Sequence, residues 1–358
     1  MKGRNTMELM DILKKSVECS ASDIFIVSGA PLCCKAYGKL IRLEETPLTA
    51  ADTLNLVCGI YAMANIGYGR DNMPQRELDF SVSVPGMGRF RANIYKQRGT
   101  YAAVMRYVPF ELPDAAAIGV PEQVMALSEC KSGIVLVTGA ASNGKSTTLS
   151  CIINKINSEH SGHIITIEDP IEFLHKHKKC IVSQREINID TESYLDALRA
   201  ALRQSPDVIL LGEMRDYETI SVAMTAAETG QLVLSTLHTL GAASTIDRII
   251  DVFPMNQQHQ IRIQLSMVLN AVVSQQLLPT VDGRLVPAFE IMTMNSAIRT
   301  LIREEKTHQI DTVIQSVPGM QTMDNCIMNL YHDGIITAQT AEDYAYNPEI
   351  MRKRLAIR

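Results

Sequence analysis

The chain has 358 residues, of which 34 are Lys or Arg and 39 are Asp or Glu, so its formal net charge is −5. Its content of 46% hydrophobic and 20% charged residues is typical of a folded protein and excludes a disordered or low-complexity chain. At about 150 residues per domain, this length predicts two domains. The weakly acidic balance argues against a dedicated nucleic-acid-binding protein, which usually has a basic surface, so we expect no stable nucleic-acid partner.

The sequence contains no recognisable export signal or membrane span. Residues 1–15 interleave charged with apolar positions and lack the continuous apolar core of a secretory signal. No stretch approaches the roughly 20 apolar residues that a membrane helix requires. The 8 cysteines are dispersed without a CxxC pair, which is typical of free thiols rather than of a zinc site or a disulfide framework. We therefore expect a cytoplasmic protein.

The first third of the chain predicts a small α+β domain over residues 1–108. An amphipathic helix capped by Thr6 opens this domain, and a second helix is expected at residues 49–65. Short runs rich in β-forming residues, separated by Gly and Pro, predict strands at residues 23–27, 39–43, 78–84 and 89–95.

A proline-rich segment follows, with Pro109, Pro113 and Pro121 close together. Proline removes a backbone donor and restricts φ, so this segment is a poor helix or strand. We place a linker at residues 109–121; a surface loop within one domain is the alternative.

The rest of the chain, residues 122–358, predicts an α/β domain. Continuous apolar runs at 134–138, 164–167, 208–211 and 232–235 alternate with helical patterns at 146–157, 194–204, 217–228 and 242–250. Continuous apolar strands indicate a sheet covered on both faces, and the alternation with helices indicates parallel strands. From about residue 290 onward we expect a mainly helical part.

The predicted strand at 134–138 leads into a complete G-x-x-x-x-G-K-[ST] motif, placed before a predicted helix. Glycines let such a loop turn tightly and direct backbone N–H groups at phosphate oxygens. Lys145 is suited to the β- and γ-phosphates, and the Ser146 hydroxyl to Mg²⁺. The motif therefore predicts an ATP site with Mg²⁺ as the metal, formed by a phosphate loop of Gly139, Ala140, Ala141, Ser142, Asn143, Gly144, Lys145, Ser146 and Thr147.

Three polar residues at the ends of predicted strands are candidate catalytic groups: Glu168, Glu213 and His238. Ligands of parallel sheets bind at the carboxyl ends of the strands, so we expect these residues beside the phosphate loop. Because Gly212 replaces the usual Asp, we read Glu213 as a carboxylate that orients the attacking water rather than as a metal ligand. His238 can donate an N–H to the γ-phosphate. Solvated acids and a structural histidine are the alternatives.

Together these motifs resemble the secretion ATPase superfamily of type II and type IV secretion and of type IV pili. Its Walker A loop corresponds to residues 139–147, its aspartate box to 167–173 (IEDPIEF), its Walker B to 211–216 (LGEMRD) and its histidine box to 235–239 (STLHT). The resemblance covers essentially the whole chain. It implies a PAS-like N-terminal α+β domain, a RecA-like P-loop domain with a mainly parallel sheet and C-terminal helices, and a homohexameric ring with ATP at the subunit boundaries.

A later segment, residues 295–304 (NSAIRTLIRE), resembles the AIRNLIRE element of the pilus-retraction ATPases. It predicts a helix in which Arg299 and Arg303 lie four residues apart. Like charges at this spacing are mildly unfavourable, which suggests a partner carboxylate or a moving surface. A plain amphipathic helix is the alternative. The residues carried over as the retraction element are Ala297, Ile298, Arg299, Leu301, Ile302, Arg303 and Glu304.

Arginines of the first domain are candidate arginine fingers for a neighbouring subunit's nucleotide. Arg91 and Arg106 resemble the family's pair best, and a planar guanidinium offers several donors to phosphate oxygens. Arg89 and Arg98 are the other candidates of this domain. Three arginines that flank the predicted catalytic strand of the second domain compete with them: Arg199, Arg203 and Arg215.

Two departures from the family pattern affect the expected activity. Family loops usually read GPTGSGKS, whereas here Ala140 replaces the Pro and Asn143 replaces a small residue. We expect phosphate binding to persist with altered affinity or turnover. The segment at 21–26 (ASDIFI) lacks the histidine that is common in the family's ASDLHL. This departure affects the expected exchange of signals between the two domains and not the expected fold.

The resemblance implies an ATP-driven motor that retracts type IV pili through an inner-membrane platform protein. Such a motor would act at the cytoplasmic face of the membrane, with the pilus assembly ATPase as a further candidate partner. An assembly, type II or type IV secretion or conjugation ATPase is the alternative within the superfamily. A weakly hydrolysing, nucleotide-gated scaffold subunit is the alternative from another class.

Overall fold

The computed structural model describes residues 7–36, 39–108, 112–214 and 216–356. Its internal contacts divide the chain into two units, Met1–Glu111 and Leu112–Arg358. Thr6, the predicted cap of the first helix, and Pro109, in the predicted linker, lie outside the described residues.

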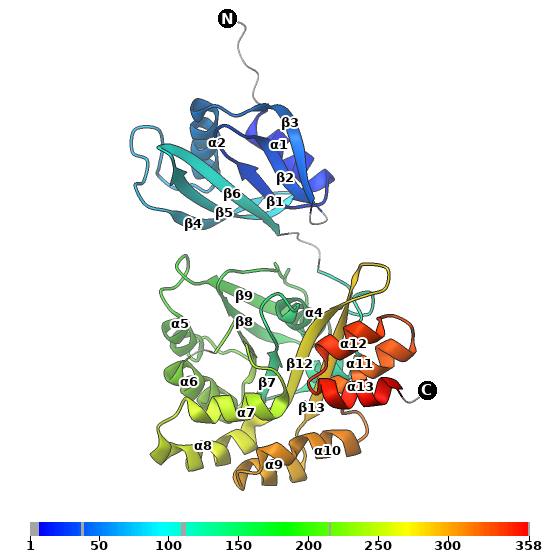
Figure 1. Ribbon diagram of the computed structural model, residues 1–358. Helices are drawn as coiled ribbons and strands as arrows, with labels where there is room; N and C mark the ends of the chain where they lie inside the picture. Colours follow the sequence, from blue (N-terminus) through cyan, green and yellow to red (C-terminus); the bar gives the residue numbers. More distant parts are fainter. Residues whose placement is uncertain (1–6, 37–38, 109–111, 215, 357–358) are drawn as a thin grey trace, which may run out of the picture. The chain divides into compact units, whose positions relative to one another are not determined.

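The first unit is a six-stranded antiparallel sheet with helices α1 and α2 packed against it (Figure 1). Burial alternates along β5, as expected for a sheet with one covered face. Thr49 and Asp52 form a capping box at the start of α2, which explains where this helix begins. In sheet order, the strands are β3 (Lys39–Pro47), β2 (Pro31–Ala36), β1 (Ala21–Ile26), β6 (Thr100–Val108), β5 (Gly88–Gln97) and β4 (Leu78–Val84); the helices are α1 (Leu9–Glu18) and α2 (Ala50–Met63).

The second unit contains a seven-stranded sheet in which every neighbouring pair is parallel except the β12–β13 hairpin. This mainly parallel sheet confirms the predicted fold class. In sheet order, the strands are β13 (Leu285–Thr293), β12 (Leu269–Pro279), β7 (Gly133–Thr138), β11 (Leu232–Leu237), β10 (Val208–Leu211), β8 (Gly162–Glu168) and β9 (Cys180–Glu186).

Helices cover both faces of this sheet, which explains the continuous apolar strands. Along β7, Ile134 and Leu136 enter one core, whereas Val135 and Val137 enter the other. One face carries α3 (Glu122–Met125), the 3₁₀ turn Ala126–Glu129 and α4 (Lys145–Glu159). The opposite face carries α5 (Tyr194–Ala201), α6 (Tyr217–Glu228), α7 (Ala242–Asp251), α8 (Met255–Val268), α9 (Ser296–Arg303) and α10 (Ile310–Ser316), with a 3₁₀ turn at Thr307–Gln309.

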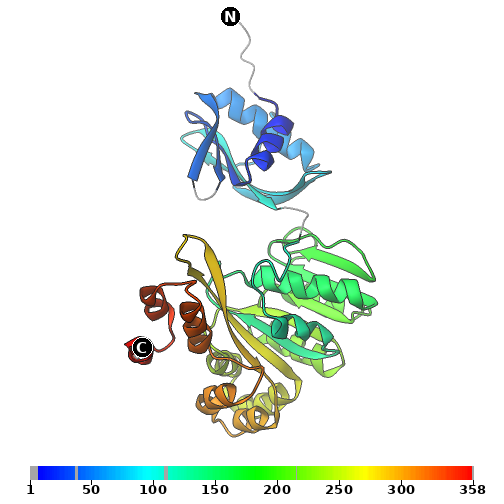
Figure 2. The ribbon, with the colours of Figure 1, turned by 90° about the vertical axis from the view of Figure 1, so that its right-hand side faces the viewer.

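The C-terminal helices, α11 (Met323–His332), α12 (Ala338–Tyr344) and α13 (Pro348–Ala356), lie beside the β12–β13 hairpin (Figures 1 and 2). They share a small apolar core with that hairpin, to which Leu278 and Ala288 contribute. Strand β13 runs to Thr293, and the helical part of the chain begins at Ser296. Among the residues that the structure describes, no helix has the length and apolar character needed to cross a membrane.

Candidate functional site

A cavity of about 450 Å³ lies at the carboxyl ends of β7, β8, β10 and β11. Its lining brings together residues 141–147 of the phosphate loop with all three predicted catalytic residues, Glu168, Glu213 and His238. Gly139 and Ala140, at the start of the loop, do not line it. The other lining residues belong to the aspartate box, the Walker B segment and the histidine box, except for Tyr194, which lies in none of these motifs; they are Asp169, Pro170, Glu172, Tyr194, Gly212 and Thr236.

The two glycines of the phosphate loop are required by its geometry. Gly139 has a φ of +139°, and a Cβ placed on it would lie 2.2 Å from the backbone oxygen of Gln275. Gly144 has a φ of +80° and directly precedes α4. Only glycine adopts such backbone conformations without strain. The loop therefore places the N-terminus of α4 at the cavity, where free N–H groups favour an anion.

Side chains and backbone of strand β12 form hydrogen bonds with the phosphate loop and with the residues that flank it. The sequence did not predict this role of β12. The side chain of Gln275 accepts a hydrogen bond from the Thr148 hydroxyl at 2.7 Å. The hydroxyls of Thr138 and Ser274 are hydrogen-bonded at 2.7 Å, and the side-chain Oδ1 of Asn143 accepts from the Leu277 N–H at 3.4 Å. These contacts tie both ends of the loop to one strand.

Lys145 is buried at the mouth of the loop. Its Nζ donates to the carbonyl oxygens of Gly139 and Ala140 at 2.8 and 2.7 Å. Burial lowers the pKa of Lys145, while the carboxylates of Glu172 and Glu213 raise it. The ammonium group is thus held by the first two carbonyls of the loop, and Lys145 lines the cavity in which a phosphate would bind.

Glu213 and His238 face each other across the cavity, with Nε2 of the histidine 3.4 Å from Oε2 of the glutamate. The Glu213 side chain is 12% exposed and that of His238 is 54% exposed, so the histidine lies on the open side of the pair. A Cβ on Gly212 would lie 2.7 Å from the Tyr194 hydroxyl, so a larger residue at this position would have to displace the Tyr194 side chain. This steric contact favours glycine over the Asp that is usual in the Walker B segment.

Glu168 lines the cavity at the carboxyl end of β8. The Thr166 hydroxyl and the Gln184 side-chain amide donate to its Oε1 at 2.7 and 3.3 Å. Burial raises the pKa of Glu168 to about 7, against the opposing effect of these hydrogen bonds. This carboxyl can therefore take up or release a proton near neutral pH.

The predicted retraction element forms α9, with Ile298 and Ile302 buried. Nη1 of Arg299 donates to the carbonyl oxygens of Ser266 and Met267 at the C-terminal end of α8. Within the described part of the chain, Arg299 is therefore held by carbonyls rather than by the expected carboxylate, because a helix C-terminus carries partial negative charge.

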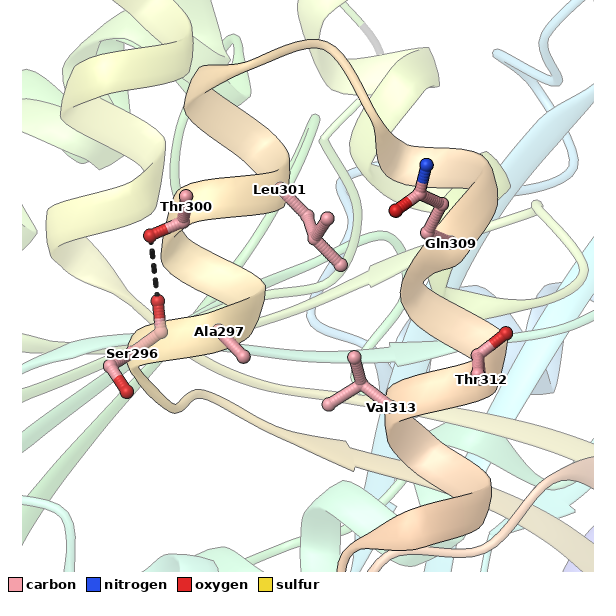
Figure 3. Close-up of a pocket in the computed structure, with 7 residues that line it drawn as sticks. All are labelled: Ser296, Ala297, Thr300, Leu301, Gln309, Thr312 and Val313. Atoms are coloured by element: carbon pink, nitrogen blue, oxygen red, sulfur yellow. Dashed lines mark hydrogen bonds between the residues drawn. The ribbon is translucent and has the colours of Figure 1, made fainter.

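A second cavity, of about 620 Å³, lies between α9 and α10 (Figure 3). Ala297 and Leu301 project from α9 toward Val313 of α10. The remaining lining residues are Ser296, Thr300, Gln309 and Thr312. The side of the retraction element that faces α10 is therefore not fully packed and borders this cavity.

Arg91 and Arg106 are directly opposite each other on β5 and β6 of the first unit. Nη2 of Arg91 lies 3.8 Å from Oδ1 of Asp79, and Nε of Arg106 donates to Oδ1 of Asp23 at 3.0 Å. Both guanidinium groups thus have carboxylate partners, and a role at a nucleotide stays a prediction. Arg215, a competing candidate, lies outside the described residues.

Comparison with known proteins identifies the family. Residues 5–309 match the family model of type II/IV secretion system proteins. The chain belongs to this family. This secretion ATPase is 43% identical over 345 residues to the type IV pilus retraction ATPase PilT of Pseudomonas aeruginosa, covering 96% of this chain and 99% of PilT.

Two further comparisons agree. The secretion ATPase is 38% identical over 349 residues to the type IV pilus ATPase PilU of Pseudomonas aeruginosa, covering 97% of this chain and 91% of PilU. A crystal structure of the pilus retraction motor PilT with bound ADP matches it with a TM-score of 0.88 and 44% identity, over 97% of this chain and 100% of the other. The comparisons confirm the predicted family, the fold class and the ATPase activity.

Proposed function

We propose that this secretion ATPase powers the retraction of type IV pili. The observation that carries the proposal is similarity to PilT along nearly the whole of both chains, at 43% identity. The cavity supports an ATP-driven motor, because Lys145 at the start of α4 meets Glu213 and His238 there, and these two follow the neighbouring strands β10 and β11. The retraction element on α9 favours retraction over assembly.

In the proposed mechanism, the phosphate loop and the N-terminus of α4 bind the phosphates of ATP. Lys145 turns from the carbonyls of Gly139 and Ala140 toward the β- and γ-phosphates. The Ser146 hydroxyl would hold Mg²⁺, and the carboxylates of Asp169 and Glu172 line the same cavity, so the oxygen-rich donor set fits this ion. Bound Mg²⁺ would neutralise charge on the phosphates.

Hydrolysis is assigned to the three residues that face the loop. Glu213 orients the attacking water, since its carboxylate is directed into the cavity and is nearly buried. His238, 3.4 Å from Glu213, donates an N–H to the γ-phosphate. Glu168, with a pKa of about 7, is suited to hold a proton during the reaction.

The assembly and its partners complete the proposal. The chain forms a homohexamer in which Arg91 and Arg106 act in trans as arginine fingers on a neighbour's nucleotide. Domain motion driven by hydrolysis passes force to an inner-membrane platform protein, so the motor works at the cytoplasmic face of the membrane. The pilus assembly ATPase is proposed as a further partner.

Deletion of the gene, with surface pili counted, tests retraction directly. Surplus pili with lost motility support the proposal, whereas loss of pili indicates an assembly or secretion ATPase instead. The ATPase rate of purified wild type and Glu213→Gln tests the motor itself. We expect a fall of at least about 100-fold, as for loss of a group that acts in the transition state. An equally slow rate in both proteins would indicate a nucleotide-gated scaffold.

A further inference from the structure

A row of buried polar side chains crosses the sheet next to the phosphate loop. Thr138 on β7, Ser274 on β12 and Glu290 on β13 are successive partners in the strand register. Thr138 and Ser274 are fully buried and Glu290 is 2% exposed. Buried carboxylates are rare without hydrogen-bond partners, so the partners of Glu290 indicate its structural role.

Glu290 holds the first residues of two helices. Its Oε1 accepts a hydrogen bond from the N–H of Ala242, at the start of α7, at 2.7 Å. Its Oε2 accepts from the N–H of Met323, at the start of α11, at 3.4 Å. The segment that immediately precedes α7, residues 238–241, begins with His238 and is called the histidine loop below. One carboxylate therefore joins the histidine loop to the C-terminal helices.

Tyr346 makes a second link between the same two parts. It lies between α12 and α13, and its side chain lies close to the Ser274 side chain and to the backbone of Gly241. Gly241 has a φ of +85°, and a Cβ on it would approach the Tyr346 ring to 3.4 Å. Asp324 on α11 accepts a hydrogen bond from the Tyr346 N–H at 2.7 Å. The end of the histidine loop is thus enclosed by groups from the C-terminal helices.

We propose that Glu290 is a positioning residue for ATP hydrolysis: it fixes the histidine loop, and through it His238, against the C-terminal helices. The inference rests on the role proposed above for His238. Glu290 does not line the nucleotide cavity and acts only through the loop. A movement of α11–α13 would therefore reach the γ-phosphate side of the site through the histidine loop.

The charged form of Glu290 is stabilised by its two backbone N–H partners, because its other surroundings oppose that form. Burial raises the pKa of Glu290 to about 7, and the nearby acids Asp311 and Asp324 add to this, while the N–H groups of Ala242 and Met323 oppose it. A glutamine at this position offers one acceptor instead of two, so its NH₂ group would face one of the two backbone N–H donors.

Glu290→Gln in the full-length chain tests the proposal. We expect kcat for ATP to fall about tenfold, while the KM for ATP and the affinity for ADP change less than about twofold, because only the transition-state contact of His238 is disturbed. Thr307→Val is the matched control. It removes a different buried hydrogen bond to the same helix, from the Thr307 hydroxyl to Asp247 of α7 at 2.9 Å, and should leave kcat unchanged.

A further variant, Tyr346→Phe, tests the same link by a second route. Tyr346→Phe retains the ring against Gly241 but loses the hydroxyl, and should lower kcat about threefold with ADP affinity unchanged. It decides the question if Glu290→Gln does not fold, and a normal kcat would then overturn the inference. A folded Glu290→Gln with wild-type kcat, or a Thr307→Val variant as slow as Glu290→Gln, overturns it as well.

His238→Ala separates this inference from the role on which it rests. If His238→Ala turns over ATP at the wild-type rate, the proposed role of His238 is wrong, and the inference fails with it. If His238→Ala is slow while Glu290→Gln and Tyr346→Phe are normal, only the positioning role of Glu290 is wrong.

Discussion

Gly212→Ala should destabilise the second unit through a single contact. The new Cβ would lie 2.7 Å from the Tyr194 hydroxyl, well inside the 3.4 Å at which ordinary contact begins, and 3.4 Å from the Ile167 carbonyl. Overpacking of this kind typically costs about 1–3 kcal/mol. Because the obstructing atom is the end of a side chain rather than backbone, we expect the lower end of that range, about 1 kcal/mol in the free energy of unfolding.

Urea denaturation of four proteins measures this contact: wild type, Gly212→Ala, Tyr194→Phe and the double variant. Phenylalanine removes the obstructing oxygen, so the alanine should cost little in the Tyr194→Phe background. The double-mutant cycle should then show a favourable coupling of about 1 kcal/mol. Additive effects, or a Gly212→Ala protein as stable as wild type, would refute the steric explanation for the missing Asp.

Three further predictions concern the loop, the buried acid and α9. Ser142 has a φ of +64°, which is strained for a residue with a Cβ, so Ser142→Gly should stabilise the protein by about 1 kcal/mol in thermal unfolding; a lower Tm would count against strain there. Burial raises the pKa of Glu168 to about 7 from 4.5, so the native state binds the extra proton. Wild type should therefore lose stability relative to Glu168→Gln as pH rises from about 4.5 to about 7, and a difference that is constant with pH would contradict this. Arg299→Ala loses its bonds to Ser266 and Met267 and should cost about 1 kcal/mol at unchanged ATPase rate, measured by urea denaturation and phosphate release.

Local patterns in the sequence were enough to predict the elements that surround the nucleotide. The apolar runs of β7, β8, β10 and β11 are continuous because both faces of each strand are covered, and this needs no knowledge of distant partners. The phosphate loop is likewise a local motif, since Gly139 and Gly144 are required by the backbone conformation of the turn itself.

The elements that the sequence reading missed lack such a local pattern. Strand β12 contains Ser274, Gln275 and Gln276 in succession, which reads as polar, although Ser274 and Gln275 are buried. Their polarity has a purpose only in the folded chain, where Ser274 meets Thr138 and Gln275 meets Thr148. Strand β9 at the opposite edge of the sheet, helix α8 and strand β13 were also not predicted.

The sequence by itself determined the chemistry of this protein: a phosphate loop, acidic residues and a histidine at strand ends, and a family to which they belong. Only the tertiary structure decided how these groups are held. The contact of Gly212 with Tyr194 and the link from Glu290 to Ala242 and Met323 join residues far apart in the chain. Sheet register and helix packing create these contacts, and neither leaves a signal in the spacing of neighbouring residues.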